Sequence, residues 1–186
     1  MSDPRPLIVT AALDESGYDW FQDLRRAWYP AERNQVPAHL TLFYALPAEA
    51  EAEIAAVLKE ACARTAPMRL DVRGPWSLGR GVAYGIESDA LVGLRTELAA
   101  RFEPWLVVQD RAPYRPHITV QNKAGPEDAR RLLEQLEAEF EPFDIQAEGL
   151  LVWRYRGGPW EALARLPFGG PARLASLTLG AVERPA

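Results

Sequence analysis

Residues 37–44 of the chain read Pro-Ala-His-Leu-Thr-Leu-Phe-Tyr, and residues 115–120 read Arg-Pro-His-Ile-Thr-Val. In both stretches a histidine and the threonine two positions later alternate with aliphatic residues. Such alternation is typical of a β-strand, in which residues i and i+2 point to the same face. Each stretch is therefore predicted to be a strand that buries its aliphatic side chains and presents its histidine and threonine together on the other face.

The chain contains only two histidines, and both occur in this pattern. His39 precedes Thr41, and His117 precedes Thr119. Polar pairs on otherwise buried strands are often functional sites. The alternative is that each histidine is a core residue hydrogen-bonded to its neighbouring threonine. We favour the functional interpretation, because the sequence around the two pairs also repeats.

The repeat extends over much of the chain. In each half a helical pattern follows the histidine strand, and a similar strand comes next, Leu-Asp-Val at 70–72 and Phe-Asp-Ile at 143–145. Each half then reaches a glycine-containing hairpin with a tryptophan, Trp76 or Trp160. Two copies are too few for a solenoid. The pattern predicts a bilobal α+β fold with two pseudo-symmetric antiparallel-sheet lobes, flanking helices and the two histidine strands facing each other across a central cleft. No linker divides the lobes, so residues 1–186 are predicted to form a single two-lobed domain.

Hydrophobic periodicity and turn residues predict the remaining elements. Helices are expected at residues 18–28, after Pro47, after Ser88 or Asp89, and from Pro126 onward. Ser88 or Asp89 would cap the third of these helices. Further strands are expected at residues 7–13, 68–72, 82–86, 105–108, 143–147, 150–155 and 160–168. Residues 174–179 could add an edge strand.

Composition narrows the function classes. The net charge is −5, from 21 basic and 26 acidic residues. Proteins that bind long duplex nucleic acid usually have a basic excess, so no such partner is expected. The sequence has no apolar run long enough to cross a bilayer and no secretory signal. The one cysteine, Cys62, fits a reducing compartment and a core position rather than a nucleophile. We expect a cytoplasmic monomer with no membrane partner.

A metal site is the main alternative use of two histidines. Catalytic zinc usually takes three protein ligands. The sequence has no His-x-His, His-x-x-x-His or paired cysteines, so carboxylates would have to complete such a site. We therefore expect neither a metal ion nor another cofactor.

The His-Leu-Thr-Leu motif at 39–42 and the His-Ile-Thr-Val motif at 117–120 resemble those of the two-histidine (2H) phosphoesterase superfamily. The Arg-Pro-His context at 115–117 resembles its bacterial 2′-5′ RNA ligase and 2′,3′-cyclic phosphodiesterase branch. The resemblance runs from the first predicted strand to about Phe168. It implies a bilobal α+β fold whose two motifs line a water-filled cleft, and metal-independent phosphodiester chemistry.

This chemistry suits the residues present. Opening a ribose 2′,3′-cyclic phosphate requires a proton from the attacking water and another for the leaving ribose oxygen. Two imidazoles, His39 and His117, can supply both steps and would give a bell-shaped pH profile. Thr41 and Thr119 would donate hydrogen bonds to the non-bridging phosphate oxygens. Ligation is the same displacement with a 5′-hydroxyl in place of water. Which histidine acts as base is left open.

The expected partner is a nucleotide 2′,3′-cyclic phosphate or an RNA terminus. Arg115 lies two residues before His117 and is expected to bind either the phosphate or a carboxylate of the other lobe. Tyr44 either stacks on a base or fills the core. The alternative function is a non-catalytic RNA-end or nucleotide-binding module of the same fold.

Overall fold

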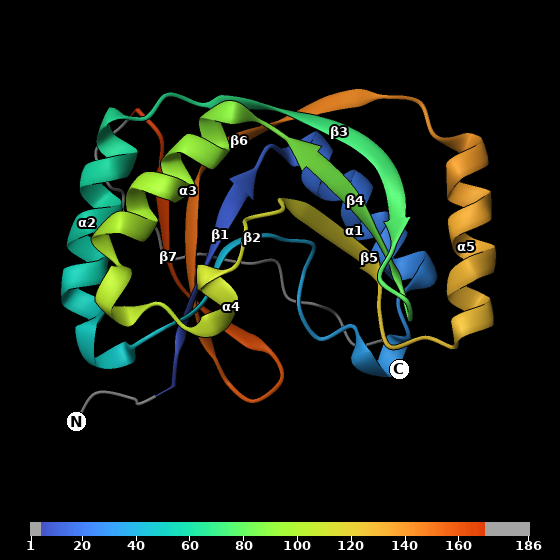
Figure 1. Cartoon of the computed structure of the whole chain (residues 1–186), viewed down its shortest axis with the longest axis horizontal. Coiled ribbons are helices and arrows are strands. Elements are labelled where there is room, and N and C mark those ends of the chain that lie inside the picture. Colours follow the sequence, from blue (N-terminus) through green and yellow to red (C-terminus); the bar gives the residue numbers. More distant parts are fainter. Residues whose placement is uncertain (1–4, 170–186) are drawn as a thin grey trace.

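The computed structural model of the chain describes residues 5–169 (Figure 1). Its strands are β1 (Leu7–Leu13), β2 (Leu40–Leu46), β3 (Met68–Ser77), β4 (Val82–Glu87), β5 (His117–Gln121), β6 (Phe143–Tyr155) and β7 (Trp160–Pro167). Its α-helices are α1 (Glu15–Trp28), α2 (Glu51–Arg64), α3 (Asp89–Arg101), α4 (Val108–Arg111) and α5 (Pro126–Glu139). Single 3₁₀ turns occupy Ala31–Arg33, Ala48–Ala50 and Glu103–Trp105.

The strands form one antiparallel sheet in the order β1-β2-β5-β4-β3-β6-β7. Strand β1 also pairs with β6, which closes the first six strands of this order into a barrel and leaves β7 attached to β6. The closure depends on the length of β6. Its first residues pair with β3, and the part from Ala147 to Arg154 pairs with β1.

The strand order of the barrel has an approximate two-fold symmetry. Exchanging β1 with β4, β2 with β5 and β3 with β6 leaves the order around the barrel unchanged. At the axis, residues from equivalent positions of the two sequence repeats pair with each other. Asp71 lies opposite Asp144, and Leu40 lies opposite Ile118. The repeated sequence therefore corresponds to repeated structure.

The α+β class and the antiparallel strands are confirmed, but three other predictions are wrong. The strands form one closed sheet rather than two separate ones, so the motif strands β2 and β5 are neighbours and do not face each other from different sheets. Residues 143–155 form one strand instead of the two predicted. At Gly149 strand β7 approaches so closely that a Cβ atom would lie 2.3 Å from the Leu166 carbonyl oxygen, so a glycine is needed for the strand to continue. The strand expected at 105–108 is also absent, since Trp105 ends a 3₁₀ turn and Val108 begins α4.

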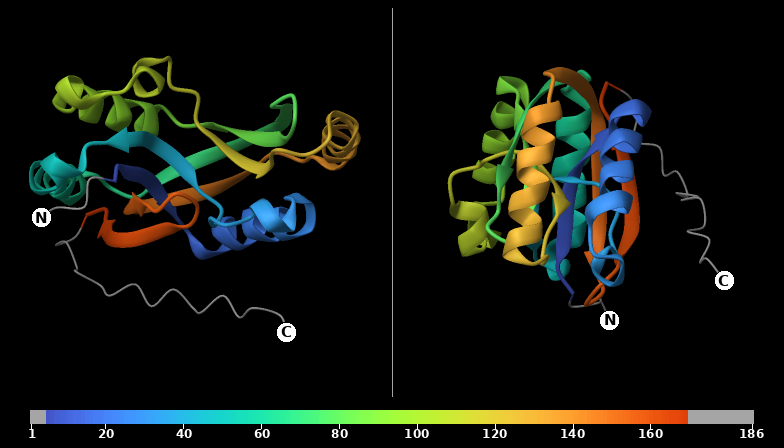
Figure 2. Two further views of the ribbon diagram at one scale, coloured as in Figure 1. Left: turned by 90° about the horizontal axis from the view of Figure 1, so that it is seen from below. Right: turned by 90° about the vertical axis from the view of Figure 1, so that its right-hand side faces the viewer.

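Helices cover the two ends of the barrel. Figures 1 and 2 show α2 and α3 side by side at one end and α1 and α5 at the other. The aromatic residues Phe21, Phe43 and Phe102 are fully buried in the core that these elements share. Ser88 caps α3 as predicted, because its side chain accepts the backbone N–H of Leu91. Within residues 5–169, every helix is too short or too polar to cross a membrane. The possible strand at 174–179 lies outside the described residues.

Candidate active site

The two His-x-Thr motifs open into a single cavity of about 400 Å³. Both motif strands contribute, and so do the C-terminal end of α1, the β3–β4 turn and α4. The lining residues are Arg25, Tyr29, His39, Thr41, Tyr44, Leu78, Gln109, His117, Thr119 and Asn122. The structure thus brings together five of the six residues that the sequence singled out.

The strand register explains why the four motif side chains meet. Leu40 pairs with Ile118 in an antiparallel bridge, and both side chains are fully buried. Extending this register places His39 opposite Thr119 and Thr41 opposite His117, on the face away from the core. Each histidine therefore has a threonine across from it and another two residues along its own strand.

Backbone carbonyls fix the orientation of both imidazoles. Nδ1 of His39 lies 2.7 Å from the carbonyl oxygen of Pro37, and Nδ1 of His117 lies 2.7 Å from that of Arg115. A carbonyl oxygen can only accept, so Nδ1 carries the hydrogen in each ring. The neutral rings consequently present Nε2 as the basic nitrogen, available to exchange protons in the cavity.

Each imidazole also packs against a tryptophan. The ring of His39 lies 4.6 Å from that of Trp160, and the ring of His117 lies 5.7 Å from that of Trp76. Trp160 begins β7, which has no counterpart in the other half, whereas Trp76 lies near the end of β3. The sequence repeat included these two tryptophans, but it did not predict that they would pack on the histidines.

The electrostatic environment of His39 favours its neutral form. Its pKa is lowered to about 4, mainly because burial penalises the charged ring. The positive charges of Arg25 and His117 add to this effect, and the hydrogen bond to Pro37 opposes it. His39 therefore stays unprotonated at neutral pH and is suited to accept a proton.

Arg25 of α1 connects the two motifs through its buried guanidinium. Nη1 donates to the carbonyl oxygen of Thr119 at 2.8 Å, and Nη2 donates to that of Val36 at 3.0 Å and to the side chain of Asn34 at 2.9 Å. The group lies over the ring of Tyr29 at 4.2 Å. Its hydrogen bonds go to neutral oxygens, so its positive charge contributes to the potential of the cavity.

Arg95 of α3 makes the corresponding connection in the other half. It donates to the carbonyl oxygens of Leu42 on β2 and Asp110 on α4. The buried carboxylate of Asp110 accepts the backbone N–H groups of Tyr44 and Ala45 at 2.9 and 3.2 Å. These contacts hold the segment before the second motif against the strand of the first.

Sequence reasoning missed both arginines, although a signal was present. Arg25 follows Phe21 by one helical turn on the buried stripe of α1, and Arg95 lies among Leu91, Leu94 and Leu98 on α3. A charged residue on an apolar helical stripe indicates a buried polar function.

Of the two remaining residues predicted from the sequence, one lines the cavity and the other does not. Tyr44 lines the cavity and is half-buried. Arg115 is exposed and does not line the cavity, but borders a smaller adjoining pocket of about 180 Å³ with Tyr44 and His117.

Burial raises the pKa of the Cys62 thiol to about 12, which argues against a nucleophilic role. Among residues 5–169, no three His, Cys, Asp or Glu side chains are grouped in a way that could hold a metal ion.

A profile of the 2′-5′ RNA ligase superfamily matches residues 13–159, a range that contains both motifs and every cavity residue. The chain belongs to the 2′-5′ RNA ligase superfamily. The resemblance to the 2H phosphoesterases is thereby confirmed. A comparison with curated proteins gave no match.

Several solved structures share the fold of this chain. The crystal structure of TT0787 from Thermus thermophilus has a TM-score of 0.66 at 22% identity and covers 89% of this chain and 98% of its own. E. coli LigT complexed with 3′-AMP has a TM-score of 0.63 at 19% identity and covers 90% of this chain and 100% of its own. LigT complexed with phosphate has a TM-score of 0.58 at 19% identity, covering 91% of this chain and 100% of its own. At these identities the likeness shows a shared fold.

Proposed function

We propose that this protein is a metal-independent phosphodiesterase that opens 2′,3′-cyclic phosphates of nucleotides or RNA ends, and that the same site can act reversibly as a 2′-5′ RNA ligase when a 5′-hydroxyl replaces water as the attacking group. The observation that carries the proposal is the single cavity lined by two oriented imidazoles and two threonine hydroxyls. We also propose, as the sequence predicts, that residues 1–186 form a single domain around this cavity.

The proposed hydrolysis uses the two imidazoles as base and acid. Nε2 of His39 takes a proton from water as the water oxygen attacks phosphorus, and protonated His117 gives a proton to the ribose oxygen that leaves. One P–O bond forms and one breaks, so the product is a phosphate monoester with a free neighbouring hydroxyl. The assignment of His39 as base is supported by the lowered pKa of its ring.

Hydrogen bonds and charge would stabilise the transition state. Thr41 and Thr119 line the cavity, and their hydroxyl groups would donate to the two non-bridging oxygens, where negative charge increases during attack. The guanidinium of Arg25 adds a fixed positive charge at the cavity wall. Tyr44 would provide an aromatic side chain for the nucleoside. Arg115, which borders the adjoining pocket with Tyr44 and His117, would contact an outer phosphate oxygen.

The superfamily supports a nucleotide as the ligand. LigT has been crystallised with 3′-AMP, ATP, NADP⁺ and phosphate. Three of these ligands carry phosphate on a ribose, and the fourth is phosphate itself. Phosphate is the group that the two motifs of this chain are suited to bind.

The test is product analysis with a 2′,3′-cyclic nucleotide and with cyclic-phosphate-ended RNA. His39→Ala and His117→Ala should each reduce turnover by about 10²- to 10⁴-fold, the usual contribution of a general acid or base. Circular dichroism should show an unchanged fold, and EDTA should leave the rate unchanged. Full turnover in either variant would refute the assignment.

The second candidate function is a nucleotide-binding module of the same fold that performs no chemistry. It predicts that a 2′-phosphorylated nucleotide binds while 2′,3′-cyclic nucleotides stay intact from pH 5 to pH 8, the range in which histidine normally titrates. The presence of all four motif side chains in one cavity favours the enzyme.

A further inference from the structure

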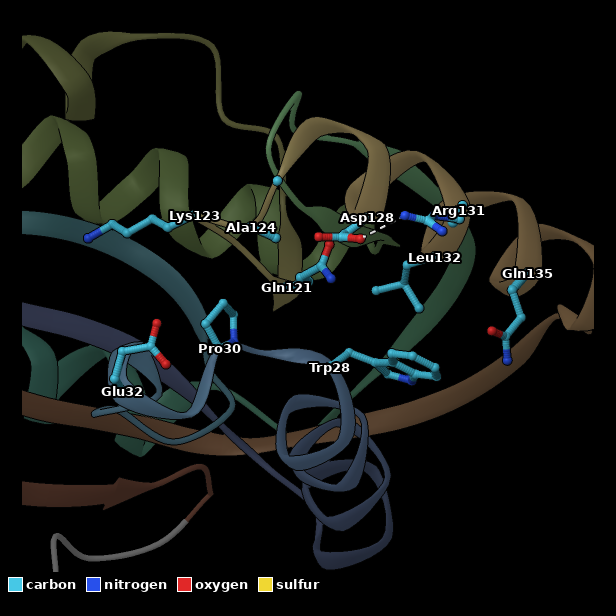
Figure 3. A pocket seen from close by; sticks show the side chains of 11 residues that line it. Trp28, Pro30, Glu32, Gln121, Lys123, Ala124, Asp128, Arg131, Leu132 and Gln135 are labelled. Atoms are coloured by element: carbon cyan, nitrogen blue, oxygen red, sulfur yellow. Dashed lines mark hydrogen bonds and ion pairs between the residues drawn. The ribbon is translucent and has the colours of Figure 1, made fainter.

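A second hollow, of about 600 Å³, lies between the C-terminal end of α1 and the first turns of α5. Figure 3 shows Trp28 and Leu132 on its walls, with Gln121, Asp128 and Arg131 nearby and Lys123 at one side. It contains neither of the two histidines. Any role of this groove is therefore in binding rather than in the proton transfers.

The groove adjoins the catalytic cavity along two chain segments. Tyr29 lines the cavity, and its neighbours Trp28 and Pro30 line the groove. Asn122 likewise lines the cavity, while Gln121 and Lys123 line the groove. On each segment, directly neighbouring residues line the two spaces, so the groove and the cavity lie next to each other.

Gln121 ends β5 and lines the groove. The pairing of β5 with β4 shifts between Thr119, opposite Ala83, and Gln121, opposite Val82, so Gln121 leaves the row formed by His117 and Thr119. Its side chain is 5% exposed, and its amide oxygen has no hydrogen-bond partner within residues 5–169. A buried acceptor without a donor is unfavourable, and a ligand N–H or O–H would satisfy it.

The other groove residues indicate the chemistry of that ligand. Trp28 is 38% exposed, and such an aromatic surface can stack on a nucleobase. Lys123 is exposed, forms no ion pair within the described chain and adopts a φ of 58°, which is uncommon for a residue with a side chain. Of the acidic side chains in the groove, Asp128 is paired with Arg131 at 3.1 Å, and Glu32 lies at one side.

We propose that this groove is the subsite for a second nucleoside, joined by a phosphodiester to the one whose cyclic phosphate reacts between the histidines. Its base stacks on Trp28 and donates an N–H to the oxygen of Gln121, and the linking phosphate lies near Lys123. The catalytic cavity, at about 400 Å³, already accommodates one nucleotide. The inference rests on the proposed function and assigns RNA ends, rather than free mononucleotides, as the preferred substrate class.

Binding of reaction products tests the subsite without requiring turnover. The probes are cytidine 2′-phosphate and the dinucleotide adenylyl-(3′→5′)-cytidine 2′-phosphate, titrated by calorimetry. We expect the dinucleotide to bind at least tenfold more tightly. Trp28→Ala should raise the Kd of the dinucleotide about tenfold more than that of the mononucleotide, as expected for loss of one base–aromatic stack. Gln121→Leu should have the same selective effect, since it removes the acceptor at similar volume.

Trp20→Ala is the matched control, because Trp20 lies on the same helix, is 39% exposed and lines a different hollow. It should leave the ratio of the two Kd values unchanged. Equal Kd values for the two probes, or equal weakening of both by Trp28→Ala, would overturn the subsite. Selective weakening of the dinucleotide in a protein that turns over no cyclic phosphate would support the subsite and refute the proposed catalytic function.

Discussion

Substitution of Trp160 tests whether burial keeps His39 neutral. The pKa of His39, about 4 instead of 6.5, corresponds to about 3 kcal/mol against the charged ring. The indole ring 4.6 Å away covers the half-buried imidazole. Trp160→Ala should admit water to this face and recover roughly half of that penalty, which raises the pKa of His39 by about one unit.

Nuclear magnetic resonance can measure this change directly. The chain has only two histidines, so its spectrum contains two histidine Cε1–H signals, and His117→Ala identifies the one that belongs to His39. Trp76→Ala is the matched control, because Trp76 packs on the other imidazole and should leave the titration of His39 unchanged. A wild-type pKa of His39 near 6.5, or no increase in Trp160→Ala, would show that the tryptophan does not control the base.

Stability provides an independent measurement of the same quantity. Because the folded-state pKa lies below the unfolded value, the unfolded chain binds more protons between pH 6.5 and about 4. The free energy of unfolding should therefore decrease as the pH falls through this window, by up to about 3 kcal/mol from His39. Urea denaturation at several pH values should show a smaller decrease in His39→Gln, and an equal decrease would contradict the linkage.

Three further substitutions test the surroundings of the site. Arg25→Lys should lower the free energy of unfolding by about 1–3 kcal/mol in urea denaturation, because an ammonium group cannot serve both carbonyls; an unchanged midpoint would contradict this. Asp110→Ala leaves two backbone N–H groups without their acceptor and should cost about 2–4 kcal/mol by the same assay, whereas a loss below 0.5 kcal/mol would argue that water replaces the carboxylate. Thr41→Val and Thr119→Val should each lower kcat about 100-fold with the fold unchanged, and a change in KM alone would assign them to ground-state binding.

The sequence allowed the strands that carry the site to be predicted, because their signal is local. Alternation around His39 and His117 identified both motifs, and the repeat indicated that they act together. The side chains that hold the motifs could not be found in this way. Arg25 bonds to a carbonyl 94 residues away, and Arg95 to one 53 residues away, so their partners depend on the closed sheet.

The errors in the fold have the same origin. Two strands were predicted at 143–147 and 150–155, but one strand continues through Gly149, where the close approach of β7 requires a residue without a side chain. The apolar residues 105–108 lacked a strand partner and instead form the end of one turn and the start of a short helix. In both places tertiary contacts outweighed local preference.

The single bridge between Leu40 and Ile118 has an evolutionary consequence. Since the repeats pair with each other at both crossings of the axis, neither half could complete a barrel alone. A half-length ancestor would have reached closure only by self-association, with one histidine from each subunit and two identical roles. In this chain the two halves are joined and differ at this point, since the tryptophan packed on His39 comes from β7 and the one packed on His117 comes from β3.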